Sequence, residues 1–186
     1  KINKIILKNR FVVSPMCQYS ANNGNPSKWH YFHLLKLALS GAGMLMFEST
    51  SINSVGRISI KDLSIKNKSN EKNLNKLVVF LRKYSDIKIG IQISHSGRKG
   101  SAQIPWIKSN FPLNKGKWKT FAPSAIRRDK HWPTPTELSL RQIKKIKQDY
   151  LKAALRAKDI GFDCLEIHMA HGYLLHQFFS KISNKR

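Results

Sequence analysis

Two histidines and a tyrosine lie close together near the end of the chain, at His168, His171 and Tyr173. They follow an apolar segment, so we expect them just beyond the end of a β-strand. Two imidazoles and a phenol can polarise a carbonyl group and deliver a proton. A zinc site needs three or four ligands, and neither Cys17 nor Cys164 has a helpful spacing, so no metal site is predicted. For one histidine taken alone, a buried structural role is the open alternative.

Other polar residues also follow apolar runs. Cys17 and Tyr19 come after the first such run, Ser49 follows Met44 to Phe47, and Gln92 lies near the end of a third run. The carboxyl ends of parallel strands meet at one edge of a sheet, so these side chains are predicted to converge. Taken alone, a buried thiol or a single strand glutamine is an ordinary structural feature.

Strand-like and helix-like segments alternate along the chain. The predicted strands are Phe11 to Met16, Met44 to Phe47, Ile87 to His95 and Asp163 to Met169, preceded by a short hairpin at Lys1 to Arg10. The predicted helices are Trp29 to Leu39, a helix that starts at Ser69, and one that Ser139 and Gln142 cap and that ends near Gly161.

The fold class that this alternation predicts is α/β with parallel strands and right-handed crossovers. A doubly wound sheet and a closed barrel both fit the periodicity. Convergence of the polar residues favours the barrel, and no G-x-G-x-x-G motif follows the first strand. A TIM (β/α)8 barrel takes about 250 residues. A chain of 186 residues is therefore predicted to hold roughly the first four strand–helix units.

Residues 96–138 have no periodic pattern and hold most of the prolines and tryptophans. A long irregular segment inside a compact domain usually has a function. We therefore predict that this loop is a lid or lies on the substrate side of the site.

The chain carries 34 Lys and Arg against 10 Asp and Glu, a formal net charge of +24. Such a charge raises the possibility of nucleic acid or an anionic membrane as a partner. The lysines are spread over every segment, and Lys, Asn and Ile share AT-rich codons, so we favour biased base composition over a dedicated nucleic-acid face as the cause of the charge. No nucleic-acid motif is recognisable, and we expect no specific nucleic-acid partner.

Two unpaired cysteines, Cys17 and Cys164, fit a reducing cytoplasm, which is the predicted location. No apolar run approaches the roughly 20 residues of a membrane span. Lys1 to Phe11 also lacks the apolar block of a signal peptide. The sequence therefore predicts no association with a membrane.

Three motifs together resemble the old yellow enzyme family, in its smaller bacterial branch of NADPH dehydrogenases and ene-reductases. They are Ser14 to Tyr19, Gly90 to Arg98 and Glu166 to Ser180. The resemblance runs in order through nearly all of the chain. It implies that residues 1–186 are the N-terminal half of a single flavin-binding barrel domain.

The activity that the resemblance implies is FMN-dependent reduction of the activated C=C bond of α,β-unsaturated carbonyl compounds, with NADPH or NADH as the reductant. His168 and His171 are implied to bind the carbonyl oxygen. Tyr173 is implied to protonate the α-carbon. Tyr19 is implied to reach the substrate.

The resemblance also implies which residues bind the flavin. They are Ser14, Pro15, Met16, Cys17, Ser49 and Gln92. Cys17 is implied to tune the redox potential, and Gln92 to donate to the pyrimidine edge of the ring.

Some features of the family are missing from these residues. The family's later strands supply a basic residue near the flavin, the phosphate-binding backbone and an arginine from a neighbouring subunit, and Lys181 stands where the family usually has a proline. We therefore expect a fragment or a truncated gene product whose parent enzyme is a homo-oligomer. The alternative is a catalytically inactive remnant with non-specific affinity for anionic partners.

Overall fold

The main sheet has four parallel strands, and the computed structural model describes all residues from Lys1 to Arg186. The strands are β1 (Val12–Val13), β2 (Met44–Ser51), β3 (Lys88–Ser94) and β6 (Cys164–Ile167), in the spatial order β1-β2-β3-β6. In the register, Val13 pairs with Leu45, Phe47 with Ile91 and Ile93 with Ile167. Each strand therefore lies beside the strand that precedes it along this sheet, as right-handed crossover units produce.

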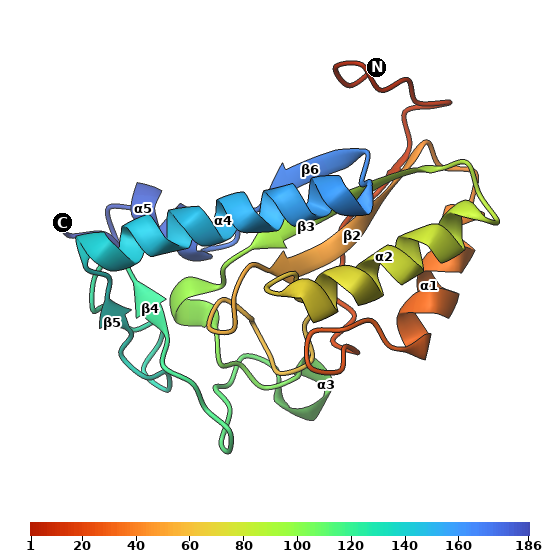
Figure 1. Cartoon of the computed structure of the whole chain (residues 1–186). Coiled ribbons are helices and arrows are strands. Elements are labelled where there is room, and N and C mark those ends of the chain that lie inside the picture. The colour runs from red at the N-terminus through yellow and green to blue at the C-terminus, as the bar shows by residue number, and fades with distance from the viewer.

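Three long helices connect these strands, namely α1 (Lys28–Ala38), α2 (Lys68–Arg82) and α4 (Leu140–Ile160). All three pack on one face of the sheet (Figure 1). The core between them contains Leu45, Phe47, Ile89, Ile91, Ile93, Leu34, Leu77 and Ala153. A doubly wound sheet has helices on both faces, whereas a barrel has them only outside. The one-sided layer is that of a barrel.

The opposite face of the sheet has no long helix over it and presents polar side chains. Gly90 pairs with Cys164 and Gln92 with Glu166, so the side chains of Cys164, Gln92 and Glu166 share this face. On β3, Gly90 and Gln92 alternate with the core residues Ile89, Ile91 and Ile93. In a closed barrel this face is the interior, and active sites form at its carboxyl end. The fold therefore directs Gln92 toward the place where the chemistry of a barrel occurs.

The structure corrects two sequence-based predictions: the lengths of the two edge strands, predicted as Phe11 to Met16 and Asp163 to Met169, and the hairpin before the first strand. β1 has only two residues and β6 only four, and both are partly exposed, with 44% of Val12 and 48% of Ile167 accessible. Each edge strand has one neighbour, so its outer side chains lack a packing partner. The hairpin predicted at Lys1 to Arg10 is also wrong, because only Ile2 and Ile5 pair there, across a tight turn.

Helix ends follow local capping chemistry, with one correction. Ser139 and Gln142 cap α4 as predicted, and Gly161 ends it with a φ of 88°. The predicted start of α2 at Ser69 is wrong. Asn67 is the cap, and its side-chain oxygen accepts a hydrogen bond from the Asn70 backbone N–H at 2.9 Å.

The segment 96–138, predicted to be irregular, contains short ordered elements. They are a 3₁₀ turn η1 (Gly97–Lys99), α3 (Pro105–Lys108) and a separate parallel pair of β4 (Phe121–Ala122) and β5 (Thr136–Glu137). The Ala102 N–H donates to the Ile58 carbonyl at 2.7 Å, which fastens the segment to the loop after β2. A last short helix, α5 (Leu174–Phe179), follows β6. No helix is long and apolar enough to cross a membrane.

Candidate active site

The loop between β6 and α5 brings the two histidines and the tyrosine of the predicted site together. The ring centroid of His168 lies 5.0 Å from that of His171 and 4.8 Å from that of Tyr173, both at steep angles. His171 and Tyr173 are 6.5 Å apart. His168 is largely buried, whereas His171 is exposed. Three polar rings thus meet around one point at the carboxyl end of β6.

The protonation state of His168 follows from its contacts. Its Nδ1 accepts a hydrogen bond from the Ala170 backbone N–H at 3.2 Å, so the neutral ring carries its proton on Nε2. Burial, and then the neighbouring His171, lower the pKa of His168 below its ordinary value. At neutral pH His168 is therefore an uncharged ring with one N–H to donate.

The backbone of this loop is held in an uncommon conformation. His171 has a φ of 53° and Gly172 a φ of 69°, and a non-glycine residue seldom adopts this left-handed region. The Lys99 ammonium donates to the His171 carbonyl at 2.7 Å and also lies 5.2 Å from the centre of the Tyr173 ring. Lys99, which was not among the predicted site residues, fastens the loop.

Gln177 is a second positioning residue that was not predicted. It is buried, and its Nε2 donates to the Gly172 carbonyl at 2.7 Å. Its amide packs so closely on η1 that a Cβ at Gly97 would lie 2.4 Å from Nε2, and Gly97 itself has a φ of 60°. The one available signal is its spacing, since Gln177 follows Tyr173 by one helical turn.

The segment after β1 contributes Cys17 and Tyr19 to the same place. Both pack with Tyr173 around the buried pair Ile58 and Trp132. Trp132 belongs to the segment 96–138, so this segment packs against Cys17, Tyr19 and Tyr173. Tyr19 also has a positive φ, 47°, which places two of the predicted substrate residues in strained backbone.

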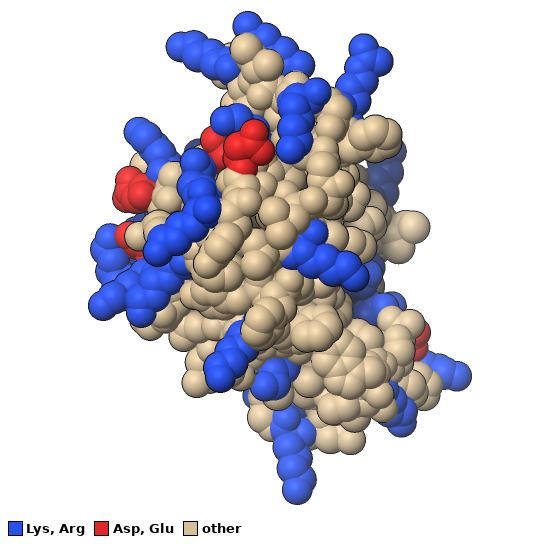
Figure 2. All heavy atoms as spheres, turned by 90° about the vertical axis from the view of Figure 1, so that its right-hand side faces the viewer, with Lys and Arg blue, Asp and Glu red and all other residues tan.

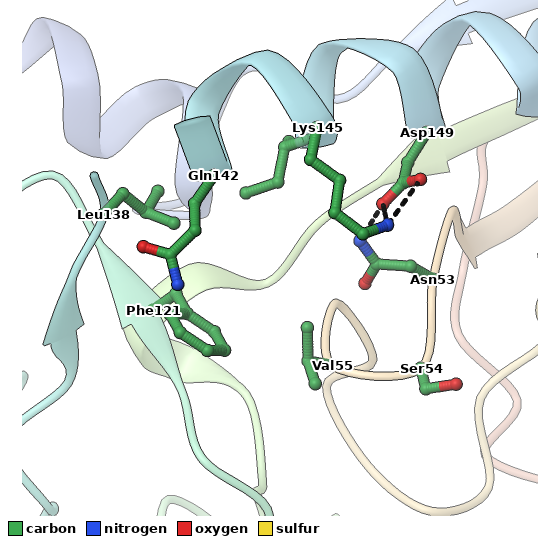
Figure 3. A pocket seen from close by; sticks show the side chains of 9 residues that line it. Asn53, Ser54, Val55, Phe121, Leu138, Gln142, Lys145 and Asp149 are labelled. Carbon is green, nitrogen blue, oxygen red and sulfur yellow. Dashed lines mark hydrogen bonds and ion pairs between the residues drawn. The ribbon is translucent and has the colours of Figure 1, made fainter. Parts of the chain in front are cut away.

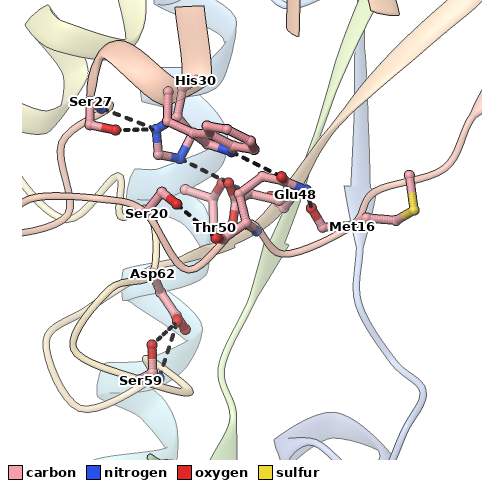
Figure 4. A network of polar contacts seen from close by, with 10 residues as sticks. Met16, Ser20, Ser27, His30, Glu48, Thr50, Ser59 and Asp62 are labelled. Atoms are coloured by element: carbon pink, nitrogen blue, oxygen red, sulfur yellow. Dashed lines mark hydrogen bonds and ion pairs between the residues drawn. The ribbon is translucent and has the colours of Figure 1, made fainter. Parts of the chain in front are cut away.

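A buried carboxyl group, Asp62, was not predicted; its charge acts on Cys17, Tyr19 and Tyr173 of this cluster. Figure 4 shows Asp62 with its partner Ser59. Asp62 accepts hydrogen bonds from the Ile58 N–H at 2.6 Å and from the Ser59 hydroxyl at 2.7 Å. Burial nevertheless raises the pKa of Asp62 to about 7. Burial is also the main cause of the raised pKa of Cys17 and of Tyr19, and the charges of Asp62 and Glu48 add to it.

A second network fastens the Cys17 segment to the sheet (Figure 4). Glu48 accepts a hydrogen bond from the Gln18 N–H at 2.9 Å and pairs with His30 Nε2 at 3.0 Å, with both side chains buried. The Nδ1 of His30 accepts from the Ser27 N–H at 3.0 Å, at the start of α1. Helix α1 thereby positions the segment through a residue of β2.

The predicted flavin residues divide into two groups. Cys17, Ser49 and Gln92 lie near one another. The Ser49 hydroxyl hydrogen-bonds the Ser94 hydroxyl, on the same strand as Gln92, and the Ser49 backbone is among the groups that lower the pKa of the Cys17 thiol. Gln92 Nε2 donates to Glu166 at 2.6 Å. The structure does not bring the others so close: Ser14 and Met16 are exposed and Pro15 is half-buried, on the segment after β1.

Comparison with known sequences places the chain among flavin enzymes. The NADH:flavin oxidoreductase / NADH oxidase family matches residues 1–186. An NADPH dehydrogenase of Listeria monocytogenes serotype 4b (strain CLIP80459) is 43% identical over 188 residues, which are 100% of this chain and 51% of the relative. An NADPH dehydrogenase of Bacillus subtilis (strain 168) is 38% identical over 187 residues, again 100% and 51%. The chain spans about half the length of these curated relatives.

Solved structures show the same fold. Morphinone reductase aligns with a TM-score of 0.85 at 24% identity, over 98% of this chain and 50% of that one. Old yellow enzyme from Pichia sp. AKU4542 aligns with a TM-score of 0.84 at 25% identity, over 100% and 48%. The fold is thus that of the TIM (β/α)8 barrel family, of which these residues supply four strands. Family and relatives imply FMN as cofactor and a nicotinamide reductant.

Proposed function

Because the chain belongs to the NADH:flavin oxidoreductase / NADH oxidase family, we propose that it is the substrate-binding half of an FMN-dependent ene-reductase. The proposed reaction reduces the activated C=C bond of an α,β-unsaturated carbonyl compound with NADPH or NADH. The observation that carries the proposal is the meeting of His168, His171 and Tyr173 in a strained loop beside Cys17. Residues 1–186 form the N-terminal half of the flavin-binding domain in this proposal.

The residues present fit a flavin at the carboxyl ends of the strands. Gln92 and Glu166 offer an amide and a carboxylate on the helix-free face, which suits the donor and acceptor edge of an isoalloxazine ring. Met16, 54% exposed, offers apolar surface for a ring face, together with Pro15. When bound, FMN supplies hydride transfer from the nicotinamide to the β-carbon of the substrate.

The two histidines orient and polarise the substrate. His168 Nε2–H makes no hydrogen bond within the chain, so it is free to donate to the carbonyl oxygen, and exposed His171 reaches the same point. Negative charge grows on that oxygen as the β-carbon gains its hydride. Hydrogen bonds to the oxygen therefore strengthen in the transition state.

Tyr173 delivers the proton to the α-carbon. Burial raises the pKa of Tyr173 above its ordinary value, so the phenol holds its proton at neutral pH. The Lys99 ammonium, 5.2 Å from the centre of the ring, stabilises the phenolate that remains when the proton leaves. Tyr173 then recovers a proton from solvent.

The test uses residues 1–186 continued by the half of the Listeria monocytogenes NADPH dehydrogenase that follows its matched part. We expect a yellow protein that oxidises NADPH and consumes 2-cyclohexenone. His168→Ala and His171→Ala should weaken enone binding as well as turnover, because donors to the carbonyl oxygen act in both the ground state and the transition state.

Two results would contradict the proposal. If the continued chain is folded, as verified by circular dichroism, but binds no flavin, the assignment of FMN as its cofactor is wrong. A flavin-loaded protein that NADPH reduces but that never consumes an enone would remove the substrate class and leave only NADPH oxidation.

A further inference from the structure

A cleft lies between α4 and the loop that joins β2 to α2, and none of its lining residues belongs to the candidate active site (Figure 3). It consists of two adjoining cavities of about 420 and 460 Å³. Asn53, Ser54, Lys145 and Asp149 line both of them. Ligand sites for small organic molecules have volumes of about 300 to 1,000 Å³, so the cleft has room for one.

One end of the cleft is apolar. Val55, Phe121, Leu138 and Ile146 line it. Gln142 reaches from α4 toward Phe121 over this end (Figure 3). The Gln142 Oε1 already accepts from the Ser139 N–H at 2.8 Å, so its Nε2 is the atom left to donate to a ligand. This end suits an aromatic or aliphatic body that carries a hydrogen-bond acceptor.

The other end of the cleft is basic. Lys66, Lys152 and Arg156 line it beside Ser54. Lys66 donates to the Ser54 hydroxyl at 3.1 Å, and Arg156 is tied to Glu71 at 3.5 Å. Lys152 has no carboxylate partner. An anion at this end would therefore find two ammonium groups without a carboxylate partner, and the Ser54 hydroxyl, which can still donate its own proton.

The pairing of the charged side chains at the cleft indicates what charge an anion bound there would carry. Four cations line the cleft. Lys145 pairs with Asp149 at 3.3 Å and Arg156 with Glu71 at 3.5 Å, so the surplus consists of two cations without a carboxylate partner, Lys66 and Lys152. Asp149 is matched by Lys145 at 3.3 Å and by the Asn53 amide at 2.9 Å, so its repulsion of an anion is reduced.

We propose that this cleft binds a small phosphate monoester with an apolar body. A phosphate monoester carries about −1.5 to −2 charges at pH 7, which balances the surplus. Its phosphate lies between Lys66 and Lys152, and its body lies against Phe121 and Val55. Two linked halves that each make contact bind more tightly than either half alone.

The probe for this site is 1-naphthyl phosphate, compared with inorganic phosphate and 1-naphthol as its two halves. Calorimetry on the 186-residue chain should give at least about tenfold tighter binding for the whole probe than for either half. Trp118 reports on the site, because its indole N–H donates to the Val55 carbonyl at 3.1 Å. Its indole N–H resonance should shift on addition of 1-naphthyl phosphate.

The variants separate a built site from attraction to a basic surface. Lys66→Gln with Lys152→Gln should weaken 1-naphthyl phosphate roughly tenfold, since each solvent-facing ion pair contributes a factor of up to about five. Lys144→Gln with Lys147→Gln removes the same charge from α4 outside the cleft and should change affinity less than twofold.

Three outcomes would overturn the proposal. Equal losses in the two double variants would mean attraction to the overall +24 charge. If inorganic phosphate binds as tightly as 1-naphthyl phosphate, the apolar end of the cleft contributes nothing to binding. An unmoved Trp118 resonance at saturating probe would place the binding elsewhere.

Discussion

At the scale of single residues, the candidate site keeps its acids protonated. Tyr173 and Cys17 lie beside buried Asp62, and burial together with these neighbours raises the pKa of both the phenol and the thiol. Burial lowers the pKa of His168, so that ring stays neutral. The cluster therefore presents donors without charge, which suits a reaction in which negative charge develops on the substrate.

Tyr173→Phe tests the assignment of the proton donor in the continued chain described above. Flavin reduction by NADPH needs no proton from Tyr173 and should proceed at an unchanged rate. Reoxidation by 2-cyclohexenone should slow by about 10²- to 10⁴-fold, the usual effect of losing a general acid. Stopped-flow absorbance of the flavin separates the two half-reactions. Reoxidation at the unmutated rate would show that another acid, or water, supplies the proton.

The raised pKa of Asp62 predicts that the stability of the fold depends on pH. The folded pKa of Asp62, about 7, lies above the value of about 3.9 in unfolded chains. The folded state therefore binds more protons between these values, and this contribution to stability is lost as pH rises from about 4 to 7. The loss is at most about 4 kcal/mol for a shift of this size.

Urea unfolding of the unmutated chain and of Asp62→Asn at pH 4.5 and pH 7.5 measures this contribution. The difference between the two proteins isolates Asp62, because buried His95, with its pKa lowered to about 4, acts in the opposite direction in both. We expect the unmutated chain to lose more stability on raising the pH. Parallel pH profiles would mean that Asp62 is ionised in the folded state.

At the scale of elements, contacts between distant segments hold the site loops in place. Gln177 on α5 packs against Gly97 of η1, and Glu48 on β2 joins His30 of α1 to the Cys17 segment. The site loops begin at the carboxyl ends of the strands of the sheet. The helices act indirectly, since their caps decide where each loop begins.

The start of α2 provides a test with a matched pair of variants. Asn67→Ala removes the side-chain cap and should lower the free energy of unfolding by about 1 kcal/mol. Ser69→Ala, in the first turn, removes no capping bond and should stay within about 0.5 kcal/mol. Urea unfolding measures both. A larger loss for Ser69→Ala would restore Ser69 as the start of the helix.

At the scale of the whole molecule, the sheet has two open edges and the surface is strongly basic. Lys and Arg are scattered over the face shown in Figure 2 rather than gathered in one stripe. Leu165 and Ile167 are exposed on β6, and Phe11 and Val12 are exposed at β1. Open edges of this kind pair with other strands, while a net charge of +24 repels other copies of the chain.

These two effects predict association that depends on salt. The 186-residue chain should self-associate more as salt screens the charge, because the sheet edges then come together. Analytical ultracentrifugation at 50 and 500 mM NaCl measures this. Ile167→Lys should reduce association, and Leu155→Lys, on the exposed side of α4, should not. A monomer at every salt and protein concentration would mean that the edges do not pair.

The sequence by itself determined the features that depend on near neighbours. Ser139, Gln142 and Gly161 bound α4 because caps act within a turn, and His168, His171 and Tyr173 meet because they share one short loop. The motifs also identified the family, because the polar residues that follow the strands occur along the chain in the order that the family has.

Only the tertiary structure decided the features that depend on contacts between distant segments. The burial of Asp62 beside Cys17, the packing of Gln177 on Gly97, and the choice of Asn67 over Ser69 as a cap leave no periodic trace. The same holds for the placing of all three long helices on one face, which excludes a doubly wound sheet. Hydrophobic periodicity shows which side of each element is buried. It does not show which other element covers that side, because many partners bury the same apolar area equally well.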